Sequence, residues 1–173
     1  TIAKSMEVVG QKYESGEYFL SEMMAAGVAV KSCIEILKKS IGNLETKNRG
    51  KVVIGTVRGD LHDLGKDLVI ALLYGLGVEV YDLGVDVSPD TFVEKTMQVN
   101  ANIVGLSALL VTTMPEMKIV IEALKKAGIR DKVRVIIGGR PVSKEYADEI
   151  GADAYAEDAF EGVRKVKEFL KIT

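Results

Sequence analysis

The hydrophobic and polar positions of this chain follow one period before residue 46 and another after residue 50. From residue 1 to about 45, apolar residues recur at alternating spacings of three and four, which is typical of amphipathic helices. We predict a helix over about 2–14 and a longer one from Leu20 to about 45, separated by Ser15-Gly16. Two helices make an incomplete bundle and the chain starts inside the first. We therefore expect further residues before Thr1 in the full protein.

After residue 50, short β-branched runs alternate with helical patterns. The predicted strands are 51–57, 78–83, 103–106, 133–137 and 152–156. The predicted helices are 66–76, 89–99, 115–127, 143–150 and 159–170. Five strands, each followed by a helix, predict an α/β fold with a doubly wound, five-stranded parallel sheet. We expect a helical cap domain at 1–45, a polar linker at 46–50 that ends in glycine, and the α/β domain at 51–173.

Two helix starts carry capping signals. Ser88 precedes Pro89, which is the pattern of an N-cap residue with proline in the first helical position. Thr113 stands three residues before Glu116, a spacing that could form a capping box.

Composition narrows the class of protein. The chain has 173 residues, of which 47% are hydrophobic, and a formal net charge of -2, so it is globular and has no basic run suited to nucleic acid. Cys33 is the only cysteine, which excludes a disulfide framework and fits a reducing, cytoplasmic setting. The apolar stretches are too short to span a membrane. We expect neither a nucleic acid nor a membrane as partner.

The predicted topology locates a ligand site. In open parallel sheets, ligands bind at the carboxyl ends of the strands, where the strand order reverses. For the order 2-1-3-4-5, that point lies between the first and third strands. The residues directly after Val57 and after Leu106 are therefore the first candidates.

The loop after the first strand contains the chain's only histidine, His62. Asp60 lies close enough in sequence to accept a hydrogen bond from one imidazole nitrogen, which would leave the other nitrogen free for a metal. Gly59 and Gly65 permit close approach of a large flat ligand. A single histidine cannot complete a zinc site, so any metal that His62 binds should bring its other ligands in a cofactor, and a macrocycle fits this requirement.

Three ordered motifs carry a resemblance to a known family. They are Asp60-x-His62-x-x-Gly65, Ser107-x-Leu109 and Gly138-Gly139, and each follows a predicted strand. Together they resemble the flavodoxin-like B12-binding fold of methionine synthase, carbon-skeleton mutases and small corrinoid proteins, over about residue 5 to the end. The resemblance implies that a cobamide, such as cobalamin, binds base-off. His62 would then replace the lower base as the cobalt ligand, with Asp60 as its hydrogen-bond partner.

The resemblance also implies further cofactor-binding residues. Thr113, with Thr112 beside it, occupies the position where family members often place a hydroxyl that bonds the aspartate. Tyr13 and Leu20 match the methionine synthase cap residues that cover the upper face of the corrin. The histidine loop would contribute Gly59, Asp60, Leu61, His62, Asp63, Leu64 and Gly65. The channel for the nucleotide tail would be lined by Ser107, Leu109, Gly138 and Gly139 and closed by Ala156, Glu157 and Asp158.

Structural interpretations of the same residues stay open. Asp60 could cap the following helix, Thr113 could be an N-cap, and Ser107 with Gly138-Gly139 could simply end strands. Tyr13, Leu20, Met23 and Met24 could form the core of the helical cap, which is the better interpretation for the two methionines. We expect Cys33 to be inert.

The function implied by the resemblance is methyl transfer. A corrinoid protein receives a methyl group on cobalt from a substrate-specific methyltransferase and yields it to a second methyltransferase that acts on a thiol or a folate. No substrate pocket is evident in the sequence, so we expect a methyl-carrier subunit that is not an enzyme alone. The alternatives are a cobalamin-sensing regulatory module and the small subunit of a B12-dependent mutase, which the cap helices disfavour. A receiver domain is disfavoured because residues 106–109 contain no acidic phosphoacceptor.

Overall fold

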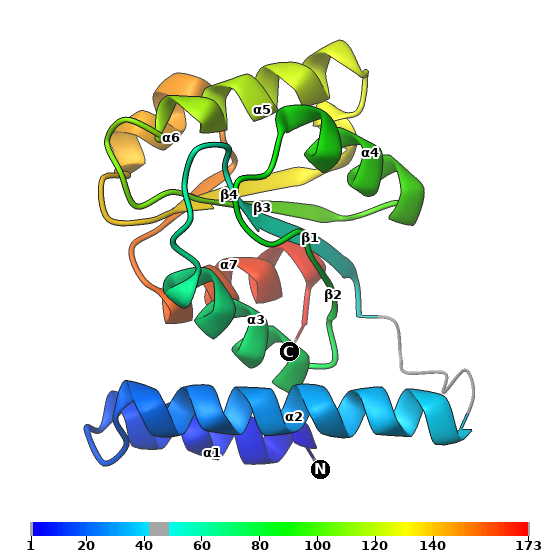
Figure 1. Cartoon of the computed structure of the whole chain (residues 1–173), viewed down its shortest axis with the longest axis vertical. Coiled ribbons are helices and arrows are strands. Elements are labelled where there is room, and N and C mark those ends of the chain that lie inside the picture. Colours follow the sequence, from blue (N-terminus) through cyan, green and yellow to red (C-terminus); the bar gives the residue numbers. More distant parts are fainter. Residues whose placement is uncertain (1, 42–48, 173) are drawn as a thin grey trace.

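The computed structural model describes residues 2–41 and 49–172, and in these residues helices cover both faces of one parallel sheet (Figure 1). The strands are β1 (Lys51–Thr56), β2 (Glu79–Asp82), β3 (Ile103–Ser107), β4 (Arg134–Gly138) and β5 (Ala154–Ala156). The helices of the α/β part are α3 (Leu64–Gly75), α4 (Pro89–Val99), α5 (Pro115–Lys126), α6 (Lys144–Ile150) and α7 (Ala159–Leu170), and a short 3-10 turn covers Arg130–Lys132.

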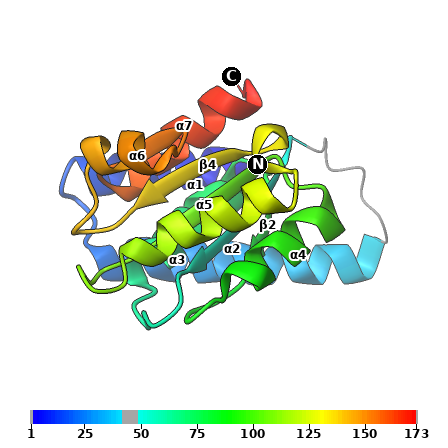
Figure 2. The same cartoon turned by 90° about the horizontal axis from the view of Figure 1, so that it is seen from above.

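The strand order is β2-β1-β3-β4-β5, and every neighbouring pair is parallel. The predicted fold class is therefore confirmed, and so is the reversal of strand order between β1 and β3. Helices α4, α5 and α6 cover one face, and α3 and α7 cover the other (Figures 1 and 2). The view turned by 90° shows α4 and α5 in front of the strands and the N-terminal helices behind them.

The alternation of side chains along each strand builds two cores. In β1, Val53 packs with α4 and α5, whereas Val52 and Ile54 pack toward α3 and α7. In β4, Ile137 packs in the same core as Val53, and Ile136 packs in the same core as Val52 and Ile54. Because successive strand residues point to opposite faces, a strand that is apolar at every position serves both layers.

The N-terminal helices α1 (Ile2–Glu14) and α2 (Leu20–Ile41) lie together against α3 (Figure 1). Met6 and Met23 are buried there with Leu68 and Leu72 of α3. Gly27 of α2 faces Ala71 so closely that a β-carbon at residue 27 would overlap the alanine side chain. Glycine thus allows the backbone of α2 to approach α3.

Some predicted boundaries differ from the structure. The helix after β1 begins at Leu64 and not at residue 66, so that Gly65, although glycine is a poor helix former, lies inside its first turn. Helix α2 is described as far as Ile41, and both its predicted end at about residue 45 and most of the predicted linker at 46–50 lie outside the described residues. No helix in the described part of the chain combines the length and apolarity needed to cross a bilayer.

The two capping predictions have different outcomes. Ser88 caps α4 as predicted, since its hydroxyl accepts a hydrogen bond from the Thr91 amide. The capping box of Thr113 and Glu116 is wrong. Helix α5 begins at Pro115 without a side-chain cap, because the Thr113 hydroxyl bonds a carboxylate on another loop.

Asp153 joins β4 and the approach to β5 at the amino-terminal edge of the sheet. Its carboxylate accepts a hydrogen bond from the Val135 amide at 2.8 Å and pairs with Arg134 at 2.6 Å and with Arg130 at 2.7 Å. Burial alone would raise the pKa of the Asp153 carboxyl. The amide and the two guanidinium groups outweigh burial and lower that pKa below its ordinary value.

We expect Asp153→Asn to lower the free energy of unfolding at neutral pH by roughly 2 kcal/mol, the scale of a hydrogen bond to a charged group. Because folding lowers the pKa of Asp153, its contribution is complete above the pKa of an unfolded aspartate, about 3.9. The contribution is lost as the pH falls from there through the lower pKa of the folded state. Urea unfolding of both proteins between pH 7 and pH 3 measures this difference.

The difference between the wild type and Asp153→Asn should shrink as the pH falls below about 4. A difference that stays constant across that range would contradict the assignment. Asp131→Asn, at an exposed carboxylate on the neighbouring 3-10 turn, is the matched control.

Candidate functional site

The loops that follow β1, β3 and β4 meet at the carboxyl edge of the sheet. The strand register brings Thr56, Ser107 and Gly138 side by side at the last residues of these strands. The three sequence motifs around His62, Ser107 and Gly138-Gly139 therefore lie next to one another. The histidine loop is further tied to the sheet by the Thr56 hydroxyl, which donates a hydrogen bond to the His62 carbonyl at 2.9 Å.

A buried carboxylate holds the histidine. Asp60 is fully buried, and its Oδ1 lies 2.8 Å from Nδ1 of His62 and 3.1 Å from the His62 amide nitrogen. Its Oδ2 accepts hydrogen bonds from the Thr113 hydroxyl at 2.6 Å and from the amides of Leu109 and Leu110 at 2.8 and 3.2 Å. The carboxylate is therefore bonded from its own loop and from the loop after β3.

These bonds set the charge of Asp60. Burial alone would raise the pKa of its carboxyl. The hydrogen bonds from Thr113, Leu109 and His62 outweigh burial and hold the pKa well below its ordinary value. Asp60 is thus an anionic acceptor at neutral pH, and it keeps the proton of a neutral imidazole on Nδ1. Nε2 is then the nitrogen of His62 that can bind a metal.

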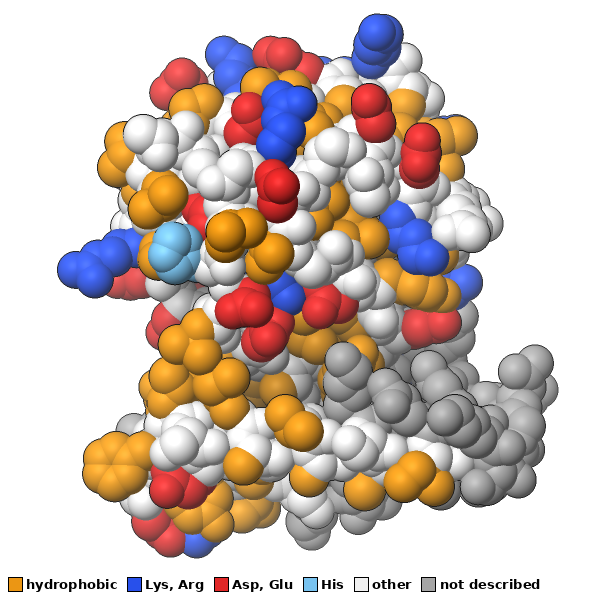
Figure 3. All heavy atoms as spheres, viewed as in Figure 1, with side chains coloured by type: hydrophobic (Ala, Val, Ile, Leu, Met, Phe, Trp, Pro, Cys, Tyr) orange, Lys and Arg blue, Asp and Glu red, His pale blue; other side chains and the backbone are white. Residues whose placement is uncertain are grey.

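His62 itself lies at the surface. Its side chain is 51% exposed, and Figure 3 shows it on an open face beside hydrophobic side chains. Leu61 and Val111, on the two loops that bond Asp60, are 70% and 72% exposed. Leu109 and Leu110 of the loop after β3 and Leu64, the first residue of α3, are also exposed apolar residues. Several exposed apolar side chains on the loops around an exposed imidazole are typical of a binding site.

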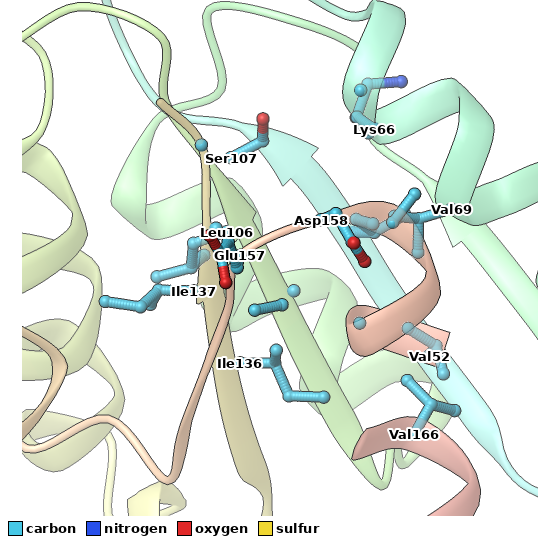
Figure 4. A pocket seen from close by; sticks show the side chains of 18 of the residues that line it. Val52, Lys66, Val69, Leu106, Ser107, Ile136, Ile137, Glu157, Asp158 and Val166 are labelled. Atoms are coloured by element: carbon cyan, nitrogen blue, oxygen red, sulfur yellow. The ribbon is translucent and has the colours of Figure 1, made fainter. Parts of the chain in front are cut away.

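A cavity of about 470 Å³ opens between the sheet and the helices α3 and α7. Figure 4 shows Ser107, Lys66 and Asp158 toward one end and the apolar Ile136, Val52 and Val166 toward the other. Its volume lies in the range of small-molecule sites. The predicted residues that line it are Gly65, Ser107, Leu109, Gly138, Gly139, Ala156, Glu157 and Asp158.

Glycines keep this cavity open. A β-carbon at Gly105 would come within 3.0 Å of the Ile54 side chain, and one at Gly138 within 3.1 Å of the Ala156 carbonyl. At Gly65 no other atom lies within 4 Å of the β-carbon position. The floor and rim of the cavity can therefore accept a flat group close to the backbone. The apolar cavity, which Gly65 of the histidine motif lines, and the exposed imidazole of His62 together fit a macrocyclic metal cofactor with an appended group.

The structure separates the two neighbouring threonines. Thr113 is buried on Asp60, whereas Thr112 is exposed. Asp63 occupies the N-cap position of α3 without a side-chain cap bond and is also exposed. Asp60 does not cap α3, because its carboxylate is engaged by His62 and by the loop after β3.

The two predicted cap residues belong to a different cluster. Tyr13 stacks on Phe160 of α7 with ring centroids 5.5 Å apart, and Leu20 packs against the same cluster as Met6 and Met23. In the structure they thus contribute to the packing of α1 and α2. Their contact with a corrin stays a prediction.

Sequence reasoning missed Lys66, which lines the cavity. Its side chain is only 2% exposed and pairs with Asp67 at 2.5 Å and with Asp82 at 2.9 Å. A lysine in the first turn of a helix is ordinarily solvated, and no local pattern signalled its burial. The nearest signal is its position directly after the histidine motif.

Fold and site together define a class: an α/β protein that binds a metal cofactor at the switch point of its sheet. Comparison with known proteins identifies the family. A family model described as a B12 binding domain matches residues 50–164, and a second model of the same description matches residues 1–38. The chain belongs to the B12-binding family, and it binds a cobamide.

Individual relatives agree with this assignment. Dimethylamine corrinoid protein 1 of Methanosarcina mazei is 46% identical over 170 residues, which are 98% of this chain and 79% of that protein. A cobalamin-binding protein from Desulfitobacterium hafniense DCB-2 is 37% identical with a TM-score of 0.76, over 96% of this chain and 78% of the other. A chain of the methanol:cobalamin methyltransferase complex MtaBC from Methanosarcina barkeri is 30% identical with a TM-score of 0.90, over 99% and 66%.

We expect Thr113→Val to lower the free energy of unfolding by about 1–3 kcal/mol, because a buried carboxylate oxygen loses a charge-assisted hydrogen bond. Thr113→Ser keeps the hydroxyl and should recover most of that loss. Chemical denaturation of the cofactor-free protein measures both variants. Equal stability of the valine and serine variants would show that the hydroxyl is not a significant donor to Asp60.

Proposed function

We propose that this chain carries a methyl group on the cobalt of a bound cobamide and passes it between two methyltransferases. One partner would be specific for the methylated substrate, and the other would act on a thiol or a folate acceptor. The observation that carries the proposal is the imidazole of His62, which is held by a buried carboxylate. His62 lies three residues before Gly65, which lines an apolar cavity. Relatives named as methylamine corrinoid proteins and the methanol:cobalamin complex support it.

The proposed binding mode is base-off with His62 as the lower axial ligand. When bound, the cobamide supplies a cobalt centre that accepts and releases a methyl group. Nε2 of His62 would bind the cobalt, and the cavity between the sheet and α7 would take the displaced nucleotide tail. Ser107 and Asp158 offer polar groups at one end of this cavity, where a tail would pass between the loops.

Asp60 would orient the ligand and hold its proton. The carboxylate keeps the proton on Nδ1, so that Nε2 presents a lone pair. If His62 leaves the metal, its ring can take up a second proton on Nε2, and the anionic Asp60 stabilises the resulting cation. The buried Asp60 carboxylate would stay in place, while Nε2 of the half-exposed His62 could bind either the metal or a proton.

The exposed apolar surface around His62 would receive the corrin ring. Leu61 and Val111 give this surface two large side chains from separate loops. We also propose that residues 1–45 act as a cap domain, joined through 46–50 to the cobamide-binding domain at 51–173, with Tyr13 and Leu20 toward the upper face of the corrin.

The direct test of the proposal is His62→Ala. We expect the absorption spectrum of cobalamin bound to this variant to differ from that of the wild type, because the protein nitrogen ligand is lost. Free imidazole, added to the variant, should restore the wild-type spectrum in part by occupying the vacated position. An unchanged spectrum in the variant, or a wild-type protein that does not bind corrinoids, would refute the proposal.

A graded pair of substitutions tests the cavity. Gly162 of α7 lines it, and a β-carbon there would lie 3.6 Å from the Ala156 side chain, an ordinary contact. We expect Gly162→Ala to stabilise the protein by up to about 1 kcal/mol through helix propensity. Gly162→Leu should keep a stable fold but weaken cobalamin binding by about ten- to hundredfold, the scale of overpacking a filled site.

Chemical denaturation and a cobalamin titration measure the two effects separately. Because the leucine is expected to affect binding without loss of stability, an unfolded variant cannot be mistaken for a blocked cavity. Unchanged affinity in a stable Gly162→Leu protein would show that the cobamide does not use this cavity.

A further inference from the structure

Asp86 has a backbone conformation that non-glycine residues rarely adopt. It lies in the loop between β2 and α4, and its φ angle is 53°. Among the described residues, the other non-glycine residues with positive φ are Asn100 and Lys171, and both terminate helices. Asp86 terminates no helix, so its left-handed conformation, which costs of order 1 kcal/mol for an L-residue, needs another explanation.

Its contacts with the histidine loop supply that explanation. Oδ1 of Asp86 accepts a hydrogen bond from the Gly59 amide at 2.7 Å. The Asp86 amide in turn donates to the Asp60 carbonyl at 3.0 Å. One residue thus bonds two consecutive residues of the loop that precedes His62, once through its side chain and once through its backbone.

We propose that Asp86 is a positioning residue for His62. By fixing the main chain of Asp60, Asp86 determines where the imidazole of His62 lies. This inference rests on the proposed role of His62 as cobalt ligand. The carboxylate of Asp60 is fixed from the loop after β3 by Thr113 and Leu109. Its main chain is fixed from the opposite side, by Asp86 of the loop after β2.

Both restraints on Asp60 bear on His62, because the imidazole bonds the Asp60 carboxylate through Nδ1. The His62 side chain is half-exposed, so the position of the ring follows the position of Asp60. A displacement of the Asp60 main chain would move the carboxylate or break its bonds to the loop after β3. In either case the free energy that holds the imidazole of His62 in place changes. The equilibrium between cobalt-bound and unbound imidazole then changes as well.

Three substitutions separate the backbone of Asp86 from its side chain. Asp86→Gly keeps the left-handed conformation without strain and removes the acceptor. Asp86→Asn keeps an acceptor and tolerates positive φ. Asp90→Asn, at an exposed carboxylate in the first turn of α4, is the control for loss of one negative charge nearby.

The readouts are amide hydrogen exchange in the cofactor-free protein and axial ligation in the loaded one. Exchange is followed in peptides that contain Gly59. Ligation is measured with bound cob(II)alamin by electron paramagnetic resonance, in which an axial nitrogen splits the cobalt lines, and His62→Ala gives the reference without the protein ligand. We expect Asp86→Gly to speed exchange at Gly59 and to lower the ligation equilibrium about fivefold, the scale of one net hydrogen bond. Asp86→Asn and Asp90→Asn should match the wild type within about twofold.

The outcomes distinguish this inference from the proposed function. If the wild type and His62→Ala give the same resonance, the proposed role of His62 fails and Asp86 has no ligand to position. If they differ while Asp86→Gly matches the wild type in ligation, the proposed function stands and the inference is overturned. An equal loss of ligation in Asp86→Asn and Asp86→Gly also overturns it, because the acceptor would then not matter. Equal unfolding free energies of Asp86→Gly and wild type exclude a general loss of fold as the cause.

Discussion

The site depends on one buried anion. Asp60 has no exposed surface and accepts five hydrogen bonds from the described residues, two from His62 and three from the loop after β3. A carboxylate away from water is costly unless such bonds compensate it. Because the bonds come from two separate strand ends, the carboxylate can be satisfied only when β1 and β3 are paired in register. The orientation of the histidine therefore depends on the pairing of β1 with β3.

The same sheet edge explains why the cavity lies where it does. Parallel strands end together, so Thr56, Ser107 and Gly138 form a row, and the loops that leave them diverge to opposite faces. The divergence leaves space between β3 and α7 that glycines at 105, 138 and 162 keep free of side chains. An apolar cavity at the same sheet edge as the histidine loop is thus a consequence of the strand order together with a few small residues.

The sequence predicted the parts of this arrangement that local patterns determine. The parallel, doubly wound sheet follows from the alternation of strands and helices, and the bond between Asp60 and His62 from a spacing of two residues. Other contacts depend on how distant loops meet. A threonine before a helix predicts a cap and a bond to a distant carboxylate equally well, so the role of Thr113 was decided only by the structure. The burial of Lys66 and the bond from Gly59 to Asp86 have no local signature for the same reason.

A histidine that must bind and release a metal needs one ring nitrogen that is held in place and one that is free to bind. The imidazole of His62 has both, because Asp60 bonds Nδ1 and leaves Nε2 free of that bond. Nδ1 is bonded to Asp60, which is buried and is itself bonded by the buried Thr113 hydroxyl, so the position of this nitrogen depends little on solvent or partner. The His62 side chain as a whole is 51% exposed, and Nε2 is the ring nitrogen that Asp60 does not engage. The two nitrogens differ because the loop after β1 places Nδ1 against the carboxylate of Asp60 and leaves the ring partly exposed. It follows that substitutions in the buried network should change how firmly the histidine is held, whereas substitutions on the exposed apolar surface should change what can approach it.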